Sequence, residues 1–153
     1  MSGISYSIPC PSCGKIHEIT YGSSVVCTYH ALTVSSLHHG GRPLLEYLVS
    51  SKKILKETFR HLEDGYSLDP GYGYQMYYCG KCRRLFVRFD YSLSKDREDS
   101  TTDTYRPDYR CWKCKCKISC ILQDEIENLN VTCNCGQDFK IHLNDDPNPE
   151  EWS

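Results

Sequence analysis

Four closely spaced cysteine pairs are the residues of this sequence that could most readily do chemistry. The pairs are Cys10 with Cys13, Cys79 with Cys82, Cys111 with Cys114, and Cys133 with Cys135. Two thiolates about one tight turn apart can converge at ~2.3 Å on one ion, and a glycine after the second cysteine lets backbone amides point at sulfur. Gly14 and Gly136 occupy that position in the first and last pairs. Since two pairs complete a tetrahedral site, the sequence predicts two structural zinc ions.

We expect the pairs to combine in chain order. The first site would then consist of Cys10, Cys13, Cys79 and Cys82, and the second of Cys111, Cys114, Cys133 and Cys135. The 65 residues at 14–78 are no obstacle to the first site, because loop closure costs only ~0.6 kcal/mol more for each doubling of loop length. Iron could replace zinc in either site, since rubredoxin-like centres also use paired cysteines.

Three cysteines stand outside these pairs. Cys27 and His30 could join the first pair in a local site of three cysteines and one histidine, which would leave the second pair to the C-terminal half of the chain. Cys27 directly follows two valines, however, and this context favours a strand cysteine packed as a small hydrophobic side chain. Cys116 and Cys120 share one face of an expected strand at about 116–122 with two aliphatic residues, so we expect them in the core.

The composition favours metal thiolates over disulfides as the stabilising element. Only 39% of the 153 residues are hydrophobic and the mean hydropathy is -0.55, so a large aliphatic core is not expected. Eleven cysteines allow a disulfide scaffold, a metal protein or a cluster of redox thiols. Residues 1–9 lack the features of a signal peptide, so we expect a cytoplasmic protein without persistent disulfides. No run approaches the ~18 apolar residues of a membrane span.

Short strands and one helix must position the cysteine pairs. Alternating or β-branched and aromatic residues after the first two pairs predict strands at 15–21 and 85–89, which we expect in one sheet. Between them, apolar residues at helical spacing, ended by Gly65, predict one helix at about 43–63. A strand leading into residue 143 follows the last pair.

The predicted fold class is α+β, with zinc-ribbon β-hairpins, one helical insertion and a second small zinc ribbon. A polar, turn-rich run suggests a domain boundary in the second half of the chain. The expected organisation is a composite zinc-ribbon unit at 1–91, a linker at 92–108, a second ribbon at 109–144 and an acidic, extended tail at 145–153.

The run Cys10-Pro11-Ser12-Cys13-Gly14, the helix-bearing insertion, the run Tyr77-Tyr78-Cys79-Gly80-Lys81-Cys82 before an aromatic strand, and the terminal ribbon form a recognisable combination. Together they resemble bacterial zinc-ribbon proteins of the CpXC-like kind. The resemblance covers most of the chain loosely. It implies that the two distant pairs share one metal, which would fall to Cys10, Cys13, Cys79 and Cys82. It implies no established activity.

The cysteine pattern argues against catalysis. A catalytic zinc keeps an open position for water, whereas four thiolates close the tetrahedron. The first pair matches half of the signature of zinc deaminases. That chemistry also needs a metal ligand and a glutamate upstream of the pair, and neither precedes it. A thioredoxin-like redox site would require a cysteine pair at the start of a helix, and none of the four pairs precedes a helical pattern. We therefore expect a protein that is not an enzyme.

Basic and aromatic residues alternate near the cysteine pairs, as in zinc ribbons that bind nucleic acid. The basic residues are Lys81, Arg83, Arg84, Arg110, Lys113, Lys115 and Lys117. They could equally offset the two negative charges of each zinc held by four thiolates, and the formal net charge is already -2. We therefore expect a protein-interaction or scaffolding module with an unknown protein partner. The alternatives are a nucleic-acid-binding zinc ribbon and a zinc or thiol-redox sensor.

Overall fold

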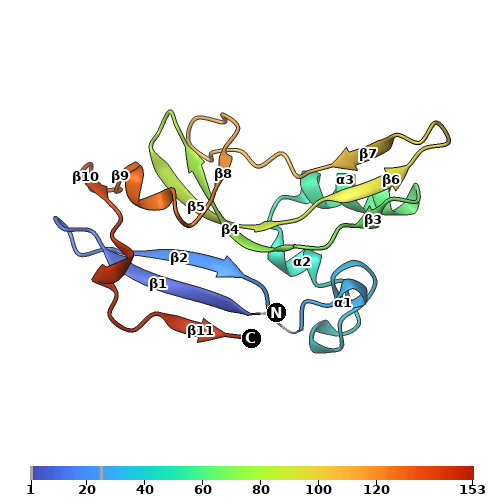
Figure 1. Cartoon of the computed structure of the whole chain (residues 1–153), viewed down its shortest axis with the longest axis horizontal. Coiled ribbons are helices and arrows are strands. Elements are labelled where there is room, and N and C mark those ends of the chain that lie inside the picture. The colour runs from blue at the N-terminus through green and yellow to red at the C-terminus, as the bar shows by residue number, and fades with distance from the viewer. Residues whose placement is uncertain (1, 25) are drawn as a thin grey trace. The chain divides into compact units, whose positions relative to one another are not determined.

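The computed structural model describes residues 2–24 and 26–153 of an α+β chain with mostly antiparallel strands (Figure 1). The chain divides into two compact units. Unit 1 consists of Met1–Gly22, Tyr74–Arg88 and Tyr109–Ser153. Unit 2 consists of Ser23–Gly73 and Phe89–Asp108. All four cysteine pairs lie in unit 1, so a single unit contains both expected metal sites.

The main sheet has the strand order β11-β1-β2-β4-β5, and β8 also pairs with β4. Its strands are β1 (Gly3–Pro9), β2 (Ile16–Gly22), β4 (Gly73–Cys79), β5 (Arg84–Asp90), β8 (Ser119–Ile121) and β11 (Glu150–Trp152). A separate two-stranded sheet joins β9 (Asn130–Thr132) to β10 (Asp138–Lys140). Short 3-10 helices occupy Ile126–Asn128 and Leu143–Asp145. The expected strands at 15–21 and 85–89 are β2 and β5, and they do belong to one sheet.

The core of unit 1 joins the two ends of the chain. Ile8 of β1 and Ile19 of β2 are almost fully buried, and they pack in one hydrophobic cluster with Val131 of β9 and with Ile141. Met76 of β4 belongs to the same cluster. Burial of aliphatic side chains of this size contributes about 1.5 to 3 kcal/mol each, so this cluster holds the C-terminal hairpin against the N-terminal one.

Unit 2 contains the longer helix and a three-stranded sheet. Its elements are α1 (Tyr29–Thr33), a 3-10 helix (Leu37–His39), α2 (Leu45–Leu48), α3 (Lys52–Glu63), β3 (Ser67–Leu68), β6 (Leu93–Asp96) and β7 (Thr102–Tyr105). Leu32, Leu45, Phe89 and Leu93 are fully buried in this unit. Thr58 of α3 is buried with them, so the packed face of α3 includes a hydroxyl group.

The helix expected at about 43–63 is divided into α2 and α3. Val49 is extended between them, with φ of -114° and ψ of 114°. The Ser51 hydroxyl accepts a hydrogen bond from the Ile54 amide at 3.3 Å, so Ser51 caps α3 and starts a new helix there. The helix ends near Gly65 as expected, and Gly65 has a left-handed φ of 90°. In the part of the chain that the structure describes, no helix is long and apolar enough to cross a bilayer.

The compact units differ from the expected domain boundaries. The run at 92–108, expected as a linker, contains β6 and β7 and belongs to unit 2. The tail at 145–153 contains β11, which pairs with β1 through Gly3 and Trp152. Local composition indicates polarity but not strand pairing, and a polar strand at a sheet edge has the composition of a loop.

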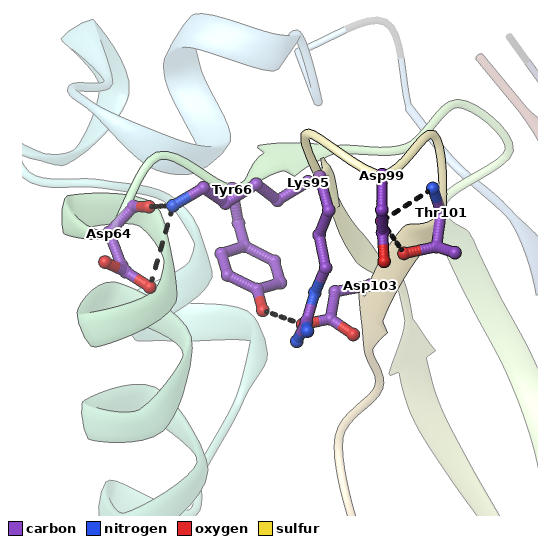
Figure 2. A network of polar contacts seen from close by, with 7 residues as sticks. Asp64, Tyr66, Lys95, Asp99, Thr101 and Asp103 are labelled. Carbon is purple, nitrogen blue, oxygen red and sulfur yellow. Dashed lines mark hydrogen bonds and ion pairs between the residues drawn. The ribbon is translucent and has the colours of Figure 1, made fainter.

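Polar contacts hold the β6–β7 hairpin to the end of α3 (Figure 2). Lys95 of β6 donates to the Asp64 carbonyl at 2.6 Å, and the Tyr66 hydroxyl donates to the Asp103 carboxylate at 3.0 Å. Asp103 also forms an ion pair with Arg97. These contacts explain why so polar a run is ordered within unit 2.

Candidate metal centres

The first group of sulfur atoms, here called cluster A, brings together Cys10, Cys13, Cys133 and Cys135. The first two residues lie in the turn of the β1–β2 hairpin, and the last two lie in the turn of the β9–β10 hairpin. The sulfur atoms of Cys10 and Cys135 are 3.7 Å apart, and those of Cys13 and Cys133 are 3.6 Å apart. All four sulfurs lie within 4.8 Å of one another.

The second group, cluster B, brings together Cys79, Cys82, Cys111 and Cys114. Cys79 is the last residue of β4, and Cys82 lies in the turn that joins β4 to β5. The other two lie in a turn that an isolated bridge between Arg110 and Lys117 closes. The sulfur atoms of Cys79 and Cys114 are 3.5 Å apart, and the Cys82 amide donates to the Cys79 sulfur at 3.4 Å.

The residue after the second cysteine has the same conformation in all four turns. Gly14 and Gly136 have φ values of 74° and 90°, and Arg83 and Lys115 have φ values of 55° and 63°. In the three turns with two intervening residues, the amide of this residue donates to the carbonyl of the first cysteine at 3.0, 2.7 and 2.9 Å. A left-handed conformation costs a residue other than glycine about 1 kcal/mol or more. Cluster B therefore has the same turn as the glycine-containing pairs, at the expense of local strain.

Both clusters fit a tetrahedral tetrathiolate metal site. Four sulfurs at ~2.3 Å from one ion in a regular tetrahedron are about 3.8 Å apart. Three of the sulfur pairs are 3.5 to 3.7 Å apart, close to that value, and the other pairs in each cluster are at most 4.8 Å apart. The three short separations are far longer than a disulfide bond. None of the eleven cysteines, all of which lie in the described ranges, forms a disulfide. Each cluster could therefore hold one metal ion, and a set of four thiolates favours zinc or iron.

The electrostatics of the thiols also favour a cation at the centre of each cluster. Hydrogen bonding from the Cys13 amide lowers the pKa of Cys10 to about 7, and hydrogen bonding from the Cys116 amide lowers the pKa of Cys114 to about 6. In the same cluster as Cys114, burial and then the neighbouring thiols raise the pKa of Cys82 to about 12. Sulfurs this close cannot all ionise unless positive charge lies among them, and a divalent ion supplies that charge.

The expected combination of pairs in chain order is wrong. Cys10 and Cys13 lie with the fourth pair instead of the second, and Cys79 and Cys82 lie with the third. The reason is the core of unit 1, in which Val131 packs with the residues of the first hairpin and so brings the last turn to the first. The eight cysteines in the two clusters are nevertheless the eight that the spacing singled out as candidate ligands.

The remaining cysteines do not enter either cluster. Cys27 is buried, with 4% of its surface exposed, but it precedes α1 and does not lie in a strand. His30 is exposed and joins no group of candidate ligands among the described residues. Cys120 is exposed and Cys116 is only partly buried, so the core position expected for this pair is wrong. Ile118 is the one buried residue on that face, and within β8 the buried residue is Ile121, so β8 turns the opposite face inward.

His17 lies beside cluster A, although the cysteine spacing alone does not identify it as part of the site. It is half-buried in β2, and its Nε2 atom lies 3.4 Å from the Cys133 sulfur in cluster A. Burial, and then the Lys15 charge, lower the pKa of His17, so the ring is held neutral and can donate one N–H to sulfur. His17 follows Cys13 by four residues, close to the start of a strand. This spacing is the sequence signal that could have identified the contact.

The basic residues near the clusters have different surroundings. Arg83 forms an ion pair with Asp138 at 2.9 Å, and Arg110 donates to the Lys115 carbonyl at 3.4 Å. Arg84 contacts Asn134 in the turn of cluster A and lies over the Trp112 ring in the turn of cluster B. Arg84 is therefore the basic side chain that connects the surroundings of both clusters.

Comparisons of the chain with protein-family models, with curated proteins and with solved structures found no match. The candidate centres therefore rest on the geometry of the two clusters, and the resemblance to zinc-ribbon proteins stays a prediction.

Proposed function

We propose that this chain is a non-catalytic zinc protein in which two structural zinc ions fasten four β turns in pairs. The observation that carries the proposal is the arrangement of eight sulfurs into two sets of four, in each of which all sulfurs lie within 4.8 Å of one another. Zinc bound by four thiolates has no open position for water or substrate, so each ion would serve the fold.

The placement of the clusters supports a structural role. Cluster A links the β1–β2 hairpin to the small β9–β10 sheet, which consists of only three residues in each strand. A two-stranded hairpin of this length is not stable alone in water. Its attachment to the first hairpin therefore depends on the hydrophobic cluster around Val131 and on the metal.

The scaffold would present surfaces for a binding partner. The sequence favours a protein partner or a purely scaffolding role, with nucleic acid as the alternative. The two turns that flank Arg84, one from each cluster, offer a specific surface for such a partner.

Metal analysis of natively purified protein tests the structural proposal. We expect two zinc ions per chain by mass spectrometry under native conditions. Cobalt substitution should give the intense visible bands of tetrahedral thiolate coordination, one equivalent for each cluster. Serine at Cys27 or Cys120 serves as the matched control and should leave two ions per chain, because neither residue lies in a cluster.

A protein that is folded without any metal, as judged by amide chemical-shift dispersion before and after treatment with a strong chelator, would contradict the proposal. If the protein purified from the native host contains iron instead of zinc, the structural role stands and only the identity of the ion changes. Cobalt spectra that show an exchangeable water ligand would contradict the non-catalytic assignment.

A further inference from the structure

A cleft of about 210 Å³ lies between the turns of the two clusters, within unit 1. Trp112, which follows Cys111 of cluster B, lines it, as does Asn134, which lies between the two cysteines of the last pair in cluster A. Lys15, His17 and Arg84 also line it. The walls of the cleft are therefore built from residues adjacent to the candidate metal ligands, and zinc binding would fix their positions.

An aromatic ring and a guanidinium group are held together in this cleft. The Arg84 guanidinium carbon lies 5.6 Å from the centroid of the Trp112 ring, within the range of a cation–π contact. One of its Nη atoms donates to the Asn134 side-chain oxygen, and its buried Nε has no hydrogen-bond acceptor among the described residues. A guanidinium has five donors, so most of them are left for a ligand or for water.

Trp112 is a large aromatic side chain that the fold does not bury. Its exposed fraction is 61%, while Phe86 beside it in the cleft is 7% exposed. Arg84 lies over one face of the indole, and the rest of the ring stays open to solvent. An oriented and exposed indole is a suitable platform for stacking a planar ring, and stacking of this kind tolerates different bases because every base has a π face.

The charge of the cleft is positive. Lys15 and Arg84 supply two cations, and no carboxylate is among the residues that line the cleft. The neighbouring carboxylate of Asp138 is engaged by the Arg83 guanidinium at 2.9 Å and by the Thr132 hydroxyl at 2.6 Å. Compensation of the negative thiolate clusters explains the cations, but it does not explain an indole left exposed next to them.

We propose that this cleft binds one nucleotide unit of a single-stranded nucleic acid. The base stacks on Trp112, and the phosphate is bound by Lys15 and Arg84. A duplex would not suit the cleft, because its base faces are already stacked, and an acidic peptide would use the cations but not the indole face. The site rests on the proposed function insofar as the metal-bound turns form its walls.

Titration with short oligonucleotides tests this site. The probes are mixed-sequence, eight-nucleotide RNA and DNA strands at low salt, followed by anisotropy of an end label and by tryptophan quenching in a Trp152→Phe background. We expect saturable binding and quenching. The Trp112→Ala variant should bind about tenfold more weakly, and Trp112→Phe should retain part of the affinity. Comparison of the RNA and DNA strands shows whether the 2′-hydroxyl contributes.

Charge variants distinguish binding in the cleft from general electrostatic attraction to the protein surface. Lys15→Gln should weaken binding and reduce the slope of log affinity against log salt by about one, since it removes one phosphate contact. Lys140→Gln is the matched control, because it makes the same charge change in β10 outside the cleft. It should leave both quantities unchanged.

Three outcomes would overturn the inference, namely no binding of either strand, unchanged affinity in Trp112→Ala, or equal effects of the two lysine variants. Quenching by an acidic peptide with no response to oligonucleotides would also overturn it and assign the cleft to a protein. Metal content and amide spectra accompany every variant. Two ions and a native spectrum without binding refute the cleft alone, whereas a metal-free folded protein refutes the structural role of zinc.

Discussion

The sulfur of Cys10 lies 3.7 Å from the sulfur of Cys135, 125 residues later in the chain. The two clusters are nested in the sequence, because both pairs of cluster B lie between the two pairs of cluster A. The nested order places the chain ends in the same unit, where β11 also pairs with β1. Formation of cluster A therefore requires that the chain has been synthesised at least as far as Cys135.

Replacement of Cys133 by serine tests the nested combination. We expect the zinc content to fall from two ions per chain to one, with Cys10, Cys13 and Cys135 becoming reactive toward iodoacetamide. Cys79 and Cys111 should stay protected, because cluster B is intact. Peptide mass spectrometry after alkylation identifies the labelled residues.

The complementary variant is Cys79→Ser, which should expose Cys111 and Cys114 and leave the first and last pairs protected. Combination in chain order predicts the reverse, since Cys133→Ser would then expose Cys111. Labelling of Cys111 in the Cys133→Ser protein would therefore refute the nested arrangement.

The ligand positions were predictable from sequence because they depend on local geometry. Two cysteines separated by one or two residues, with a following residue able to adopt a left-handed conformation, define each turn without reference to the rest of the fold. Which turns meet depends on long-range packing. The entropy of loop closure varies only logarithmically with length, so it could not distinguish the nested order from the chain order.

The elements of the fold were predictable to different degrees for similar reasons. Strands β2 and β5 follow from alternation and β-branched residues, which are local properties. The break before α3 depends on whether Ser51 caps a helix or continues one, and both choices are compatible with the sequence pattern. The β6–β7 hairpin depends on contacts such as Tyr66 with Asp103, which join residues 37 positions apart. Composition cannot reveal such contacts.

Cluster A should lose its metal before cluster B. Cys13 and Cys135 are exposed in cluster A, whereas Cys82 and Cys114, the corresponding residues of cluster B, are partly buried. Attack by a chelator or by peroxide follows thiolate exposure, so we expect two phases of zinc release. A chromogenic chelator follows the release, and alkylation of samples taken after the first phase should label Cys13 first. Early labelling of Cys111 would show that burial does not control the order.

Replacement of Lys115 by glycine should stabilise the protein. Lys115 has a φ of 63°, and its amide donates to the Cys111 carbonyl in the turn of cluster B. Glycine adopts this conformation without strain but loses more entropy on folding, so we expect a net gain of up to about 1 kcal/mol in the free energy of unfolding. Denaturation of the zinc-bound protein measures it. The control is Lys113→Gly in the same turn, where φ is not positive and glycine should destabilise instead.

A buried hydroxyl pair should make a measurable contribution to unit 2. The Thr58 hydroxyl donates to the Ile54 carbonyl at 2.8 Å and pairs with the Tyr91 hydroxyl at 2.7 Å. Thr58→Val would leave the Tyr91 hydroxyl buried without this partner, and we expect a loss of about 1 to 3 kcal/mol in the free energy of unfolding. The double variant with Tyr91→Phe should lose less than the sum of the two single variants. Additive losses in this cycle would show that the two hydroxyls do not interact.

The Asp103 carboxyl group should titrate below its ordinary range. Hydrogen bonding from Arg97, and then from Tyr66, lowers the pKa of Asp103 because both donors stabilise the charged form. Figure 2 shows the contact between the Tyr66 hydroxyl and the Asp103 carboxylate. A lowered pKa in the folded state means that the contribution of Asp103 to stability is present above its unfolded pKa of about 3.9. That contribution is lost as the pH falls through the folded pKa, because the folded state must then take up the proton.

Arg97→Gln should therefore raise the pKa of Asp103 toward its ordinary value, as measured by carbon NMR of the carboxyl group across a pH titration. Asp99, in the loop between β6 and β7, provides an internal control. Its pKa is also lowered, but by hydrogen bonds from the Thr101 side chain and amide, in which Arg97 takes no part. The Asp99 midpoint should consequently stay in place while that of Asp103 rises. Equal shifts of both carboxyl groups would indicate that Arg97 acts through the conformation of the whole hairpin loop instead of through its ion pair.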